Sequence, residues 1–369
     1  MRPFPFAAKN SLETDACVYS IRLRGGSPFF DKIHSARCQG HDNSPSSLTR
    51  MTMEIILGIE KIARPFRNPV VALGNFDGIH LGHQCIFQRT KREASKVGGE
   101  SIAFTFEPHP LKVLYADDCP PLITPFKKKM MLIESLGLDV VICAAFTKEF
   151  SAMPAREFVK SILVDRIGTQ RIIVGYNYSF GQGRRGGVED LKNYAQEFGF
   201  QVTVVSPVRV GNQTVSSSTI RTLIQNGEMA EAAGLLGRHF MVIGKVIWGT
   251  ARGRLLGVPT ANVEILNELY PKNGVYAVDV QIEKKTYPGV ANVGVNPTFG
   301  GDRFSVEVHI FDFDRSIYGE EIQVTFIERI RGETAFETPD ALVKQIRSDM
   351  DHARQILKSV ECPWEKEAR

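Results

Sequence analysis

Cysteine is scarce in this sequence, and none of it is arranged to staple a fold or to bind a metal. The six cysteines stand far apart along 369 residues, and no two of them form a Cys-x-x-Cys pair. Scattered cysteines favour free thiols in a reducing compartment over disulfides or a zinc site. We therefore expect a cytoplasmic protein with no cysteine-based metal centre.

Long apolar runs and dense basic runs are missing as well. No apolar run approaches the roughly 20 residues that a membrane-spanning helix needs, so we expect no membrane contact. The net charge is only +4, from 45 Lys and Arg against 41 Asp and Glu. Such a balance suits small anionic substrates and gives no case for a nucleic-acid partner. The sequence leaves the oligomeric state open, and a homo-oligomer remains possible.

The length and composition are those of a globular protein with two domains. A chain of 369 residues, 43% hydrophobic and 23% charged, can bury two separate cores. Residues 1–52 are the exception, because they lack sustained periodicity and are rich in Ser, Gly, Arg and Asn. They contain no apolar stretch typical of a secretory signal, and their acidic residues disfavour a transit peptide. We expect a disordered extension or a start site assigned too early.

The segment VVALGNFDGIHLGH, residues 70–83, is the most informative part of the chain. The apolar run at 70–73 predicts a short buried strand, and the glycines and polar residues after it predict a turn. A helix is expected from His80 onward, with His80 and His83 on one face of its first turn. The free N–H groups and the positive dipole end of a helix favour phosphate there. We interpret the segment as a phosphate cradle, but not a Walker loop, because no Gly-Lys-Ser/Thr follows.

A purely structural interpretation of this segment is the main alternative. Strand, glycine turn and helix occur in any α/β domain, and a single helical histidine usually serves the fold. Two histidines at this spacing, directly after Gly-x-Phe-Asp-Gly, favour the functional interpretation.

Residues 53–235 alternate between strand and helix patterns. Strands are expected at 101–107, 139–146, 171–176 and 200–208, with helices at 125–137, 154–166 and 188–199. This alternation predicts a parallel sheet with right-handed crossovers. The formal G-x-G-x-x-G match at 181–186 is rejected as a dinucleotide site. The preceding strand ends several residues earlier, and no acidic residue stands about 20 positions on.

From residue 236 to 362 the pattern changes to closely spaced β-runs. The runs at 239–249, 274–282, 285–295, 304–313 and 321–331 are separated by Gly, Pro and Asn turns, which predicts a compact antiparallel barrel. The segment 335–360 then predicts one closing helix. Its apolar face is formed by residues repeating at three and four positions, namely Leu342, Ile346, Met350, Ala353 and Leu357.

Two loops of the first domain and one serine run add further polar groups. His109 stands between two prolines at the end of a strand, and Asn177 follows another strand. The segment VSSSTIR at 215–221 places successive hydroxyls before a helix that carries Arg221, which predicts a second anion-binding helix start. A rigid loop around His109 and a plain helix cap at the serines are the alternatives.

The second domain contains a glycine- and arginine-rich loop, GTARGRLLGVPTAN, at 249–262. Its glycines let backbone amides approach phosphates, and its arginines hold them. If the end of the loop is extended, Thr260 and Asn262 face the same side, and their oxygens suit Mg²⁺. In the later run SVEVHI, alternation sends Val306 and Val308 to one face and Glu307 to the other. A solvated outer face is the plain alternative for a single glutamate in a strand.

These motifs resemble, in order, those of the bacterial bifunctional riboflavin kinase/FAD synthetase family. The GxFDGxHxGH signature matches the nucleotidyltransferase-type α/β domain, and the run GRxLGxPTAN matches the riboflavin kinase barrel. The resemblance covers about residues 53–360. It implies ATP as co-substrate, Mg²⁺ as cofactor, phosphorylation of riboflavin to FMN, and adenylylation of FMN to FAD with release of pyrophosphate.

The resemblance also implies roles for individual residues. Glu307 matches the family's base for the riboflavin hydroxyl, Thr260 and Asn262 match the metal ligands, and Arg331 falls in a segment that helps to hold substrate. Ser218 departs from the pattern, which usually has Thr there. The residues that match the first reaction centre are Gly74, Phe76, Asp77, Gly78, His80, His83, His109, Asn177, Ser217, Ser218 and Arg221. Those that match the phosphate loop of the second are Gly249, Arg252, Gly253 and Arg254.

Three other functions remain open at this point. One half of the chain could be inactive, although the principal motif residues are present in both. The barrel could sense flavin without catalysis, which the retained Glu307 disfavours because sensing needs no base. The first domain could adenylylate another phosphate acceptor, such as a nicotinate or pantetheine phosphate, which its own motif does not exclude.

Overall fold

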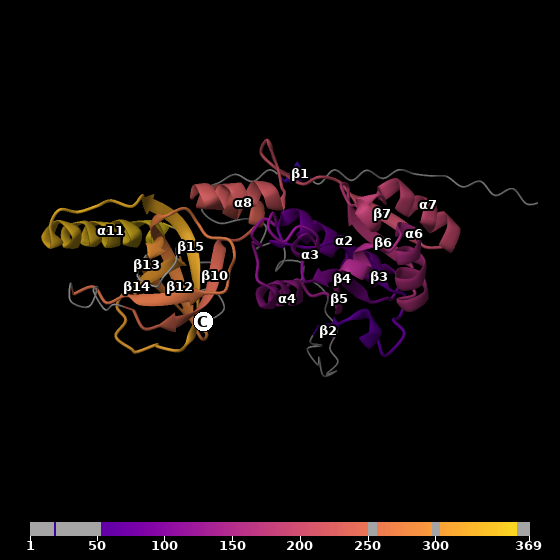
Figure 1. The fold of residues 1–369 in the computed structure, drawn as a ribbon, viewed down its shortest axis with the longest axis horizontal. Coiled ribbons are helices and arrows are strands. Elements are labelled where there is room, and N and C mark those ends of the chain that lie inside the picture. The colour runs from indigo at the N-terminus through magenta and orange to yellow at the C-terminus, as the bar shows by residue number, and fades with distance from the viewer. Residues whose placement is uncertain (1–17, 20–52, 250–256, 297–302, 360–369) are drawn as a thin grey trace, which may run out of the picture.

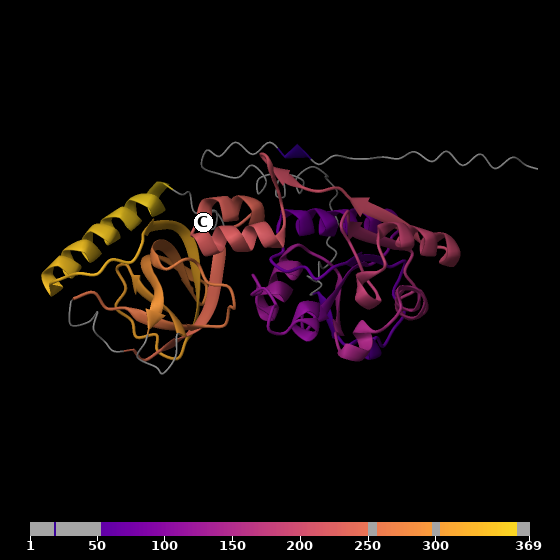
Figure 2. The same ribbon diagram turned by 45° about the horizontal axis from the view of Figure 1, so that its top comes forward.

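The computed structural model describes residues 18–19, 53–249, 257–296 and 303–359. Within these ranges the chain forms an α/β lobe and a β-barrel lobe, with the helices of residues 217–236 between them in both views (Figures 1 and 2). No helix in these ranges is long and apolar enough to cross a membrane. The predicted phosphate-loop residues Arg252, Gly253 and Arg254 lie outside the described residues.

The first lobe is built on a parallel sheet of six strands, as the alternating pattern predicts. Strand β3 (Val70–Leu73) is buried at every residue and lies between β4 (Ser101–Glu107) and β6 (Arg171–Gly175). The order β2-β5-β4-β3-β6-β7 is completed by β2 (Glu54–Leu57), β5 (Val140–Ala145) and β7 (Gln201–Val205). From β3 the chain adds β4 and β5 on one side, and it then returns to add β6 and β7 on the other side of β3. The switch point is therefore between β3 and β6, where ligands bind in open parallel sheets.

Helices connect these strands at the predicted places. The segment expected to be helical at 154–166 continues from α6 (Ala155–Glu157) into a wider π-type helix, η2 (Phe158–Arg166). The other helical elements of the lobe are η1 (Ile59–Lys61), α2 (Leu81–Lys96), α3 (Pro110–Leu114), α4 (Phe126–Ser135), α5 (Lys148–Ser151), η3 (Gln182–Arg184) and α7 (Val188–Phe198). The rejected G-x-G-x-x-G stretch forms only the short turn η3.

A small sheet follows the large one. The strands β8 (Arg209–Val210) and β9 (Gln213–Thr214) form a hairpin. Strand β1 (Val18–Tyr19) pairs with β8 in parallel. The chain then continues into α8 (Ser217–Asn226) and α9 (Met229–Leu236).

The second lobe is a closed barrel of six antiparallel strands in the order β10-β11-β14-β13-β12-β15. The valines that alternate along its strands form the interior, and Val306 and Val308 are both almost fully buried. Strand β11 (Ala261–Ile265) was not predicted, because its first two residues, Ala261 and Asn262, were assigned to the loop motif at 249–262. The other strands are β10 (Phe240–Ile247), β12 (Gly274–Ile282), β13 (Lys285–Asn296), β14 (Arg303–Ile310) and β15 (Glu321–Arg331).

The predicted closing helix is α11 (Pro339–Ser359), which lies along the outside of the barrel (Figure 2). Ala353 and Ile356 are buried against outward-facing side chains such as Val275 and Ile327, with Met350 and Leu357 partly buried beside them. Met350, Ala353 and Leu357 confirm the C-terminal part of the apolar face expected from the spacing. Leu342 and Ile346 are only half-buried and do not belong to this cluster. The helix also buries Asp349, a carboxylate that the spacing did not single out.

Candidate functional site

The loop after β3 has an unusual backbone conformation. Phe76, Gly78 and Ile79 all have positive φ angles, of 52°, 87° and 42°. Such a conformation is natural for glycine but strained for a β-branched residue such as Ile79. Phe76 is 1% exposed and packs against Phe87 and His83. Phe76 therefore supports the ring of His83 by packing against its edge, which is a role that the motif alone did not reveal.

The two histidines stack at the start of α2. Their ring centroids lie 3.6 Å apart. His80 is the N-cap residue, and its Nδ1 accepts a hydrogen bond from the backbone N–H of His83 at 3.3 Å. Since Nδ1 of His80 accepts, its proton lies on Nε2, and Nε2–H can donate to a ligand. Burial lowers the pKa of His80 to about 3, and burial also lowers the pKa of His83 well below its ordinary value. Both imidazoles are therefore neutral at pH 7.

Asp77 joins this loop to the predicted serine segment. Its carboxylate accepts from the guanidinium of Arg221 at 2.7 Å and from the backbone N–H groups of Ile123 and Thr124. Its backbone carbonyl accepts from the hydroxyl of Ser217 at 3.0 Å. The two segments that the sequence predicts to bind anions, about 140 positions apart, are thus brought together.

The serine segment differs slightly from its predicted layout. Ser216 is the N-cap of α8 and accepts from the N–H of Thr219, so Ser217 and Ser218 are the first two residues inside the helix. Arg221 lies one turn further along, where it also donates to the carbonyl of Pro121. The cap residue Ser216 was not singled out from the sequence, although any of three successive serines could have served.

His109 and Asn177 lie at the ends of the strands on either side of β3. His109 follows β4, caps α3 by accepting from Leu111 N–H, and is 7% exposed. Burial and the nearby charges of Lys129 and Arg221 lower its pKa to about 4. Asn177 follows β6 and is exposed. Because parallel strands end at one edge of a sheet, both residues flank the histidine loop.

Two residues that were not predicted from the sequence, Gln84 and Arg238, hold the loop between β3 and α2 through its backbone carbonyls. Gln84 donates to the carbonyls of Ile79 and Leu236 at 2.9 Å. Arg238, which precedes the first barrel strand, donates to the carbonyls of Gly78 and Ile79 at 2.7 and 3.1 Å. The strained turn is therefore fixed by contacts across the junction of the lobes. No local pattern could reveal contacts about 160 positions apart.

In the barrel, the predicted metal and base residues form a row across neighbouring strands. Asn262 on β11 pairs directly with Glu307 on β14, and Glu307 pairs with Asn292 on β13. Glu307 is half-buried between the buried Val306 and Val308. It therefore faces outward from the barrel, as alternation predicts.

The described residues at both ends of the glycine- and arginine-rich loop lie close to the row formed by Asn262, Glu307 and Asn292. A Cβ atom at Gly249 would overlap the side-chain amide of Asn262, so only glycine fits there without displacement. Thr260 directly precedes β11, and the neighbouring Pro259 carbonyl lies 2.8 Å from Nδ1 of His309 on β14. Thr260 and Asn262 supply oxygen atoms, which Mg²⁺ prefers. Within the described ranges, no cluster of three His, Cys, Asp or Glu residues could hold a metal ion.

Arg331 ends β15 and has partners within the fold. Its guanidinium donates to both carboxylate oxygens of Asp349 on α11 at 2.8–3.0 Å and to the carbonyl of Gly332. The closing helix therefore orients this arginine. Its role in holding substrate stays a prediction.

Comparison with known proteins relates both lobes to flavin enzymes. A sequence model described as FAD synthetase matches residues 63–219, and one described as riboflavin kinase matches residues 236–357. The bifunctional riboflavin kinase/FMN adenylyltransferase of Escherichia coli (strain K12) is 35% identical over 307 residues, which are 83% of this chain and 98% of that protein. The chain belongs to this family.

Two other similar proteins match this chain over about the same share of its length. The family member of Listeria monocytogenes serovar 1/2a is 37% identical over 80% of this chain and 94% of its own length. A crystal structure from Streptococcus pneumoniae, described as a macrolide-efflux protein, is 36% identical with a TM-score of 0.76. It covers 82% of this chain and 99% of that one. The two structures therefore share one fold over 82% of this chain.

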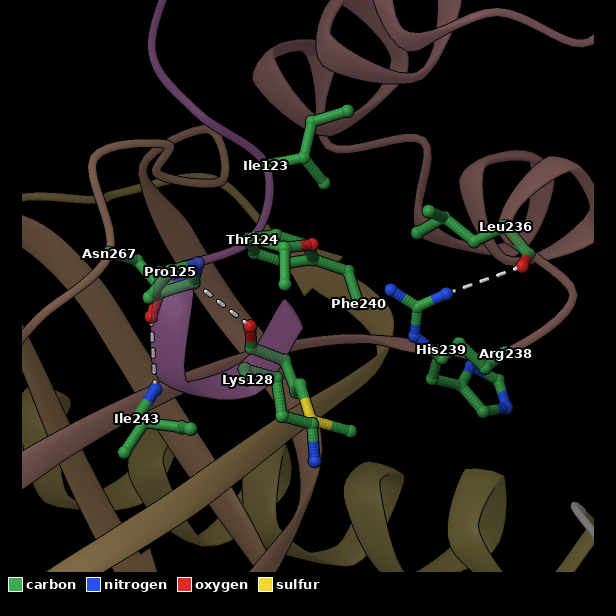
Figure 3. Close-up of a pocket in the computed structure, with 11 residues that line it drawn as sticks. Ile123, Thr124, Pro125, Lys128, Leu236, Arg238, His239, Phe240, Ile243 and Asn267 are labelled. Atoms are coloured by element: carbon green, nitrogen blue, oxygen red, sulfur yellow. Dashed lines mark hydrogen bonds between the residues drawn. The ribbon is translucent and has the colours of Figure 1, made fainter. Parts of the chain in front are cut away.

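A small cavity lies at the junction of the lobes (Figure 3). Arg238, whose guanidinium reaches the Leu236 carbonyl, borders it together with His239 and Lys128. None of the predicted site residues lines this cavity. The described residues among them lie instead at the strand ends of the first lobe and on the barrel.

The neutral histidines predict a loss of stability in mild acid. Because the folded-state pKa values of His80 and His109 are about 3 and 4, the unfolded chain binds more protons than the folded chain below pH 6.5. Stability then falls as pH falls, by on the order of 2 kcal/mol per histidine at pH 5. Urea unfolding at pH 7.5 and pH 5.0 measures this. His109→Asn, which can still cap α3, should reduce the pH dependence, and an unchanged dependence would contradict the assignment.

The Asp77–Arg221 pair should be costly to break. Asp77→Asn leaves a guanidinium buried without its carboxylate, and we expect a loss of about 3–5 kcal/mol in the free energy of unfolding. As a matched control, Asp165→Asn removes the exposed Lys160–Asp165 pair and should cost no more than about 1 kcal/mol. Denaturant titration of both variants provides the comparison. Equal small effects would show that the pair does not hold the two segments together.

Proposed function

We propose that this chain catalyses two consecutive steps of flavin cofactor synthesis. Residues 236–362 form the domain that transfers phosphate from ATP to riboflavin, giving FMN. Residues 53–235 form the domain that transfers the adenylyl group of a second ATP to FMN, giving FAD and pyrophosphate. The observation that carries this proposal is family membership along both lobes, at 35% identity over 83% of the chain.

The geometry of the first lobe supports a positioning mechanism for adenylyl transfer. An oxygen of the FMN phosphate attacks the α-phosphorus of ATP, and the bond to pyrophosphate breaks. The nucleophile is already an anion, so this step needs no general base. It needs aligned donors that stabilise the developing charge. The donors that we assign are Nε2–H of His80, the imidazole of His83, the start of α2 and the Ser217–Arg221 segment.

The remaining predicted residues of this site take supporting positions. Gly74, Asp77 and Gly78 shape the turn that presents the histidines, and Phe76 packs beneath them. His109 and Asn177 lie on the two flanks of β3, at opposite sides of the switch point. Ser218 is exposed in the first turn of α8, where its hydroxyl is accessible to a phosphate.

The barrel supports a different chemistry. A riboflavin hydroxyl is a weak nucleophile and gains from a base that accepts its proton during attack on the γ-phosphorus of ATP. We assign that base to Glu307, whose cross-strand neighbour is Asn262. Gly249, Arg252, Gly253 and Arg254 are assigned to the ATP phosphates, and Arg331 to substrate binding.

We further propose that Mg²⁺ is held at the barrel site by the side-chain oxygens of Thr260 and Asn262. The donor set fits the ion, because it offers neutral oxygens and leaves room for phosphate oxygens as further ligands. When bound, Mg²⁺ neutralises charge on the transferred phosphate. We place the enzyme in the cytoplasm, where the described free thiols Cys85, Cys119 and Cys143 stay reduced, and a homo-oligomer remains open.

Separate variants should disable the two activities separately. Purified protein is incubated with riboflavin, ATP and Mg²⁺, and the flavins are followed by chromatography. Glu307→Ala should lower FMN formation at least 100-fold while still converting supplied FMN to FAD. The double variant His80→Ala/His83→Ala should stop at FMN, with FAD formation at least 100-fold slower.

Exposed Glu328 on β15 provides the control, since Glu328→Gln should leave both rates unchanged. If wild-type protein binds riboflavin but never phosphorylates it, the barrel is a flavin sensor and the kinase assignment is wrong.

The metal assignment makes its own prediction. Asn262→Ala should raise the Mg²⁺ concentration needed for half-maximal riboflavin phosphorylation by about 10-fold or more. The Mg²⁺ dependence of FMN adenylylation by the same variant is the internal control and should not change. A parallel shift in both reactions would argue against a local metal site in the barrel.

A further inference from the structure

Helix α4 carries three successive lysines that point in different directions. Lys127 forms an ion pair with Glu321, and Lys128 donates to Gln323, both on barrel strand β15. Lys129 instead lies on the buried side of the helix with Met130 and Ile133 and is only 5% exposed. A lysine on the apolar stripe of a helix is a signal that is visible in the sequence.

The ammonium of Lys129 has weak partners for so buried a charge. It lies 3.5 Å from both the Thr105 hydroxyl and the Phe106 carbonyl, at the end of β4. The ring centroid of Phe126 is 5.8 Å away. No carboxylate of the described residues forms an ion pair with it within 4.0 Å. Burying an ammonium in this way is expensive unless an anion compensates it.

The position of Lys129 is next to the adenylyl transfer site. Its charge contributes to the lowered pKa values of both His83 and His109. Asp77 and Glu107 are the carboxylates whose charges act on it in return, and burial lowers its own pKa. Lys129 therefore lies among the side chains at the ends of β3 and β4.

Most positively charged or titratable side chains near Lys129 are neutral or have close hydrogen-bond partners. His80 and His83 are neutral at pH 7, and the guanidinium of Arg221 is paired with Asp77. Arg238 directs its N–H groups to the carbonyls of Gly78 and Ile79. Among the described cations named here, Lys129 is the one that has neither a carboxylate within 4.0 Å nor a hydrogen bond shorter than 3.5 Å. A triphosphate bound here would supply the missing anion.

We propose that Lys129 is a catalytic residue of adenylyl transfer, whose ammonium binds a non-bridging oxygen of the ATP triphosphate beside the histidine pair. As the FMN oxygen bonds to the α-phosphorus, the bond to the β-phosphate oxygen breaks, and pyrophosphate leaves with the electron pair. Lys129 keeps its proton throughout and neutralises the charge that builds on the leaving group. This inference rests on the proposed function and extends it to a residue outside the histidine and serine motifs.

The test replaces the ammonium with an apolar group of similar length. Lys129→Met should lower kcat for FMN adenylylation at least 100-fold, as expected for loss of one preorganised charge donor. The KM for FMN should stay within threefold, and riboflavin phosphorylation by the same preparation should be unchanged. Thermal unfolding should occur at the same temperature or higher, because a buried charge is removed. Lys128→Met is the matched control and should leave FAD formation within threefold of wild type.

A second measurement separates this inference from the proposed function. Calorimetry with magnesium pyrophosphate should show binding at least 10-fold weaker in Lys129→Met than in wild type. If wild type makes FAD and the variant is within threefold of it, Lys129 is structural and the inference is wrong. If wild type makes no FAD, the proposed function is wrong. The role of Lys129 is then judged from the pyrophosphate affinity alone. Equal affinity in the two proteins then overturns the role of Lys129, and weaker affinity in the variant supports it.

Discussion

The ion pair between Asp77 and Arg221 is the interaction on which the first reaction centre depends. It joins a strained loop after β3 to the helix start at Ser217, and the Ser217 hydroxyl reinforces it by donating to the Asp77 carbonyl. Both partners are largely buried, at 6% and 11% exposure of their side chains. A buried pair with such hydrogen bonds is costly to break. It fixes the loop after β3 and the start of α8 in one geometry.

The same pair also affects how much positive charge is available around the loop after β3. Arg221 is paired with Asp77, both motif histidines are neutral by burial, and Arg238 directs its N–H groups to backbone carbonyls. The side chains around the loop after β3 are therefore mainly hydrogen-bond donors, and Lys129 is the buried cation whose hydrogen bonds are all 3.5 Å long.

The junction of the lobes contributes to the first site although the chemistry of the barrel is separate. Gln84 and Arg238 hold the carbonyls of Gly78 and Ile79, and Arg238 directly precedes the barrel. Apolar side chains of α2, α8, α9 and the barrel interior also form one continuous cluster. The strained turn that precedes the histidine-bearing helix is therefore stabilised by residues at the junction of the two lobes. This gives a physical reason why the two lobes are linked in one chain.

The sequence by itself determined the element order, the parallel sheet, the antiparallel barrel and the motif segments, because these follow from local periodicity and turn chemistry. It also placed Glu307 on the outer face, since alternation along a strand is local. It left β11 unpredicted, because the first residues of that strand belong to the loop motif, and it left Lys129 unremarked although that lysine stands on the apolar stripe of a helix. The contacts of Arg238 with Gly78 and Ile79 and the pairing of Asp77 with Arg221 were decided only by the tertiary structure, because they join residues distant in the chain. The same holds for the burial of Phe76, because burial is a property of the assembled fold.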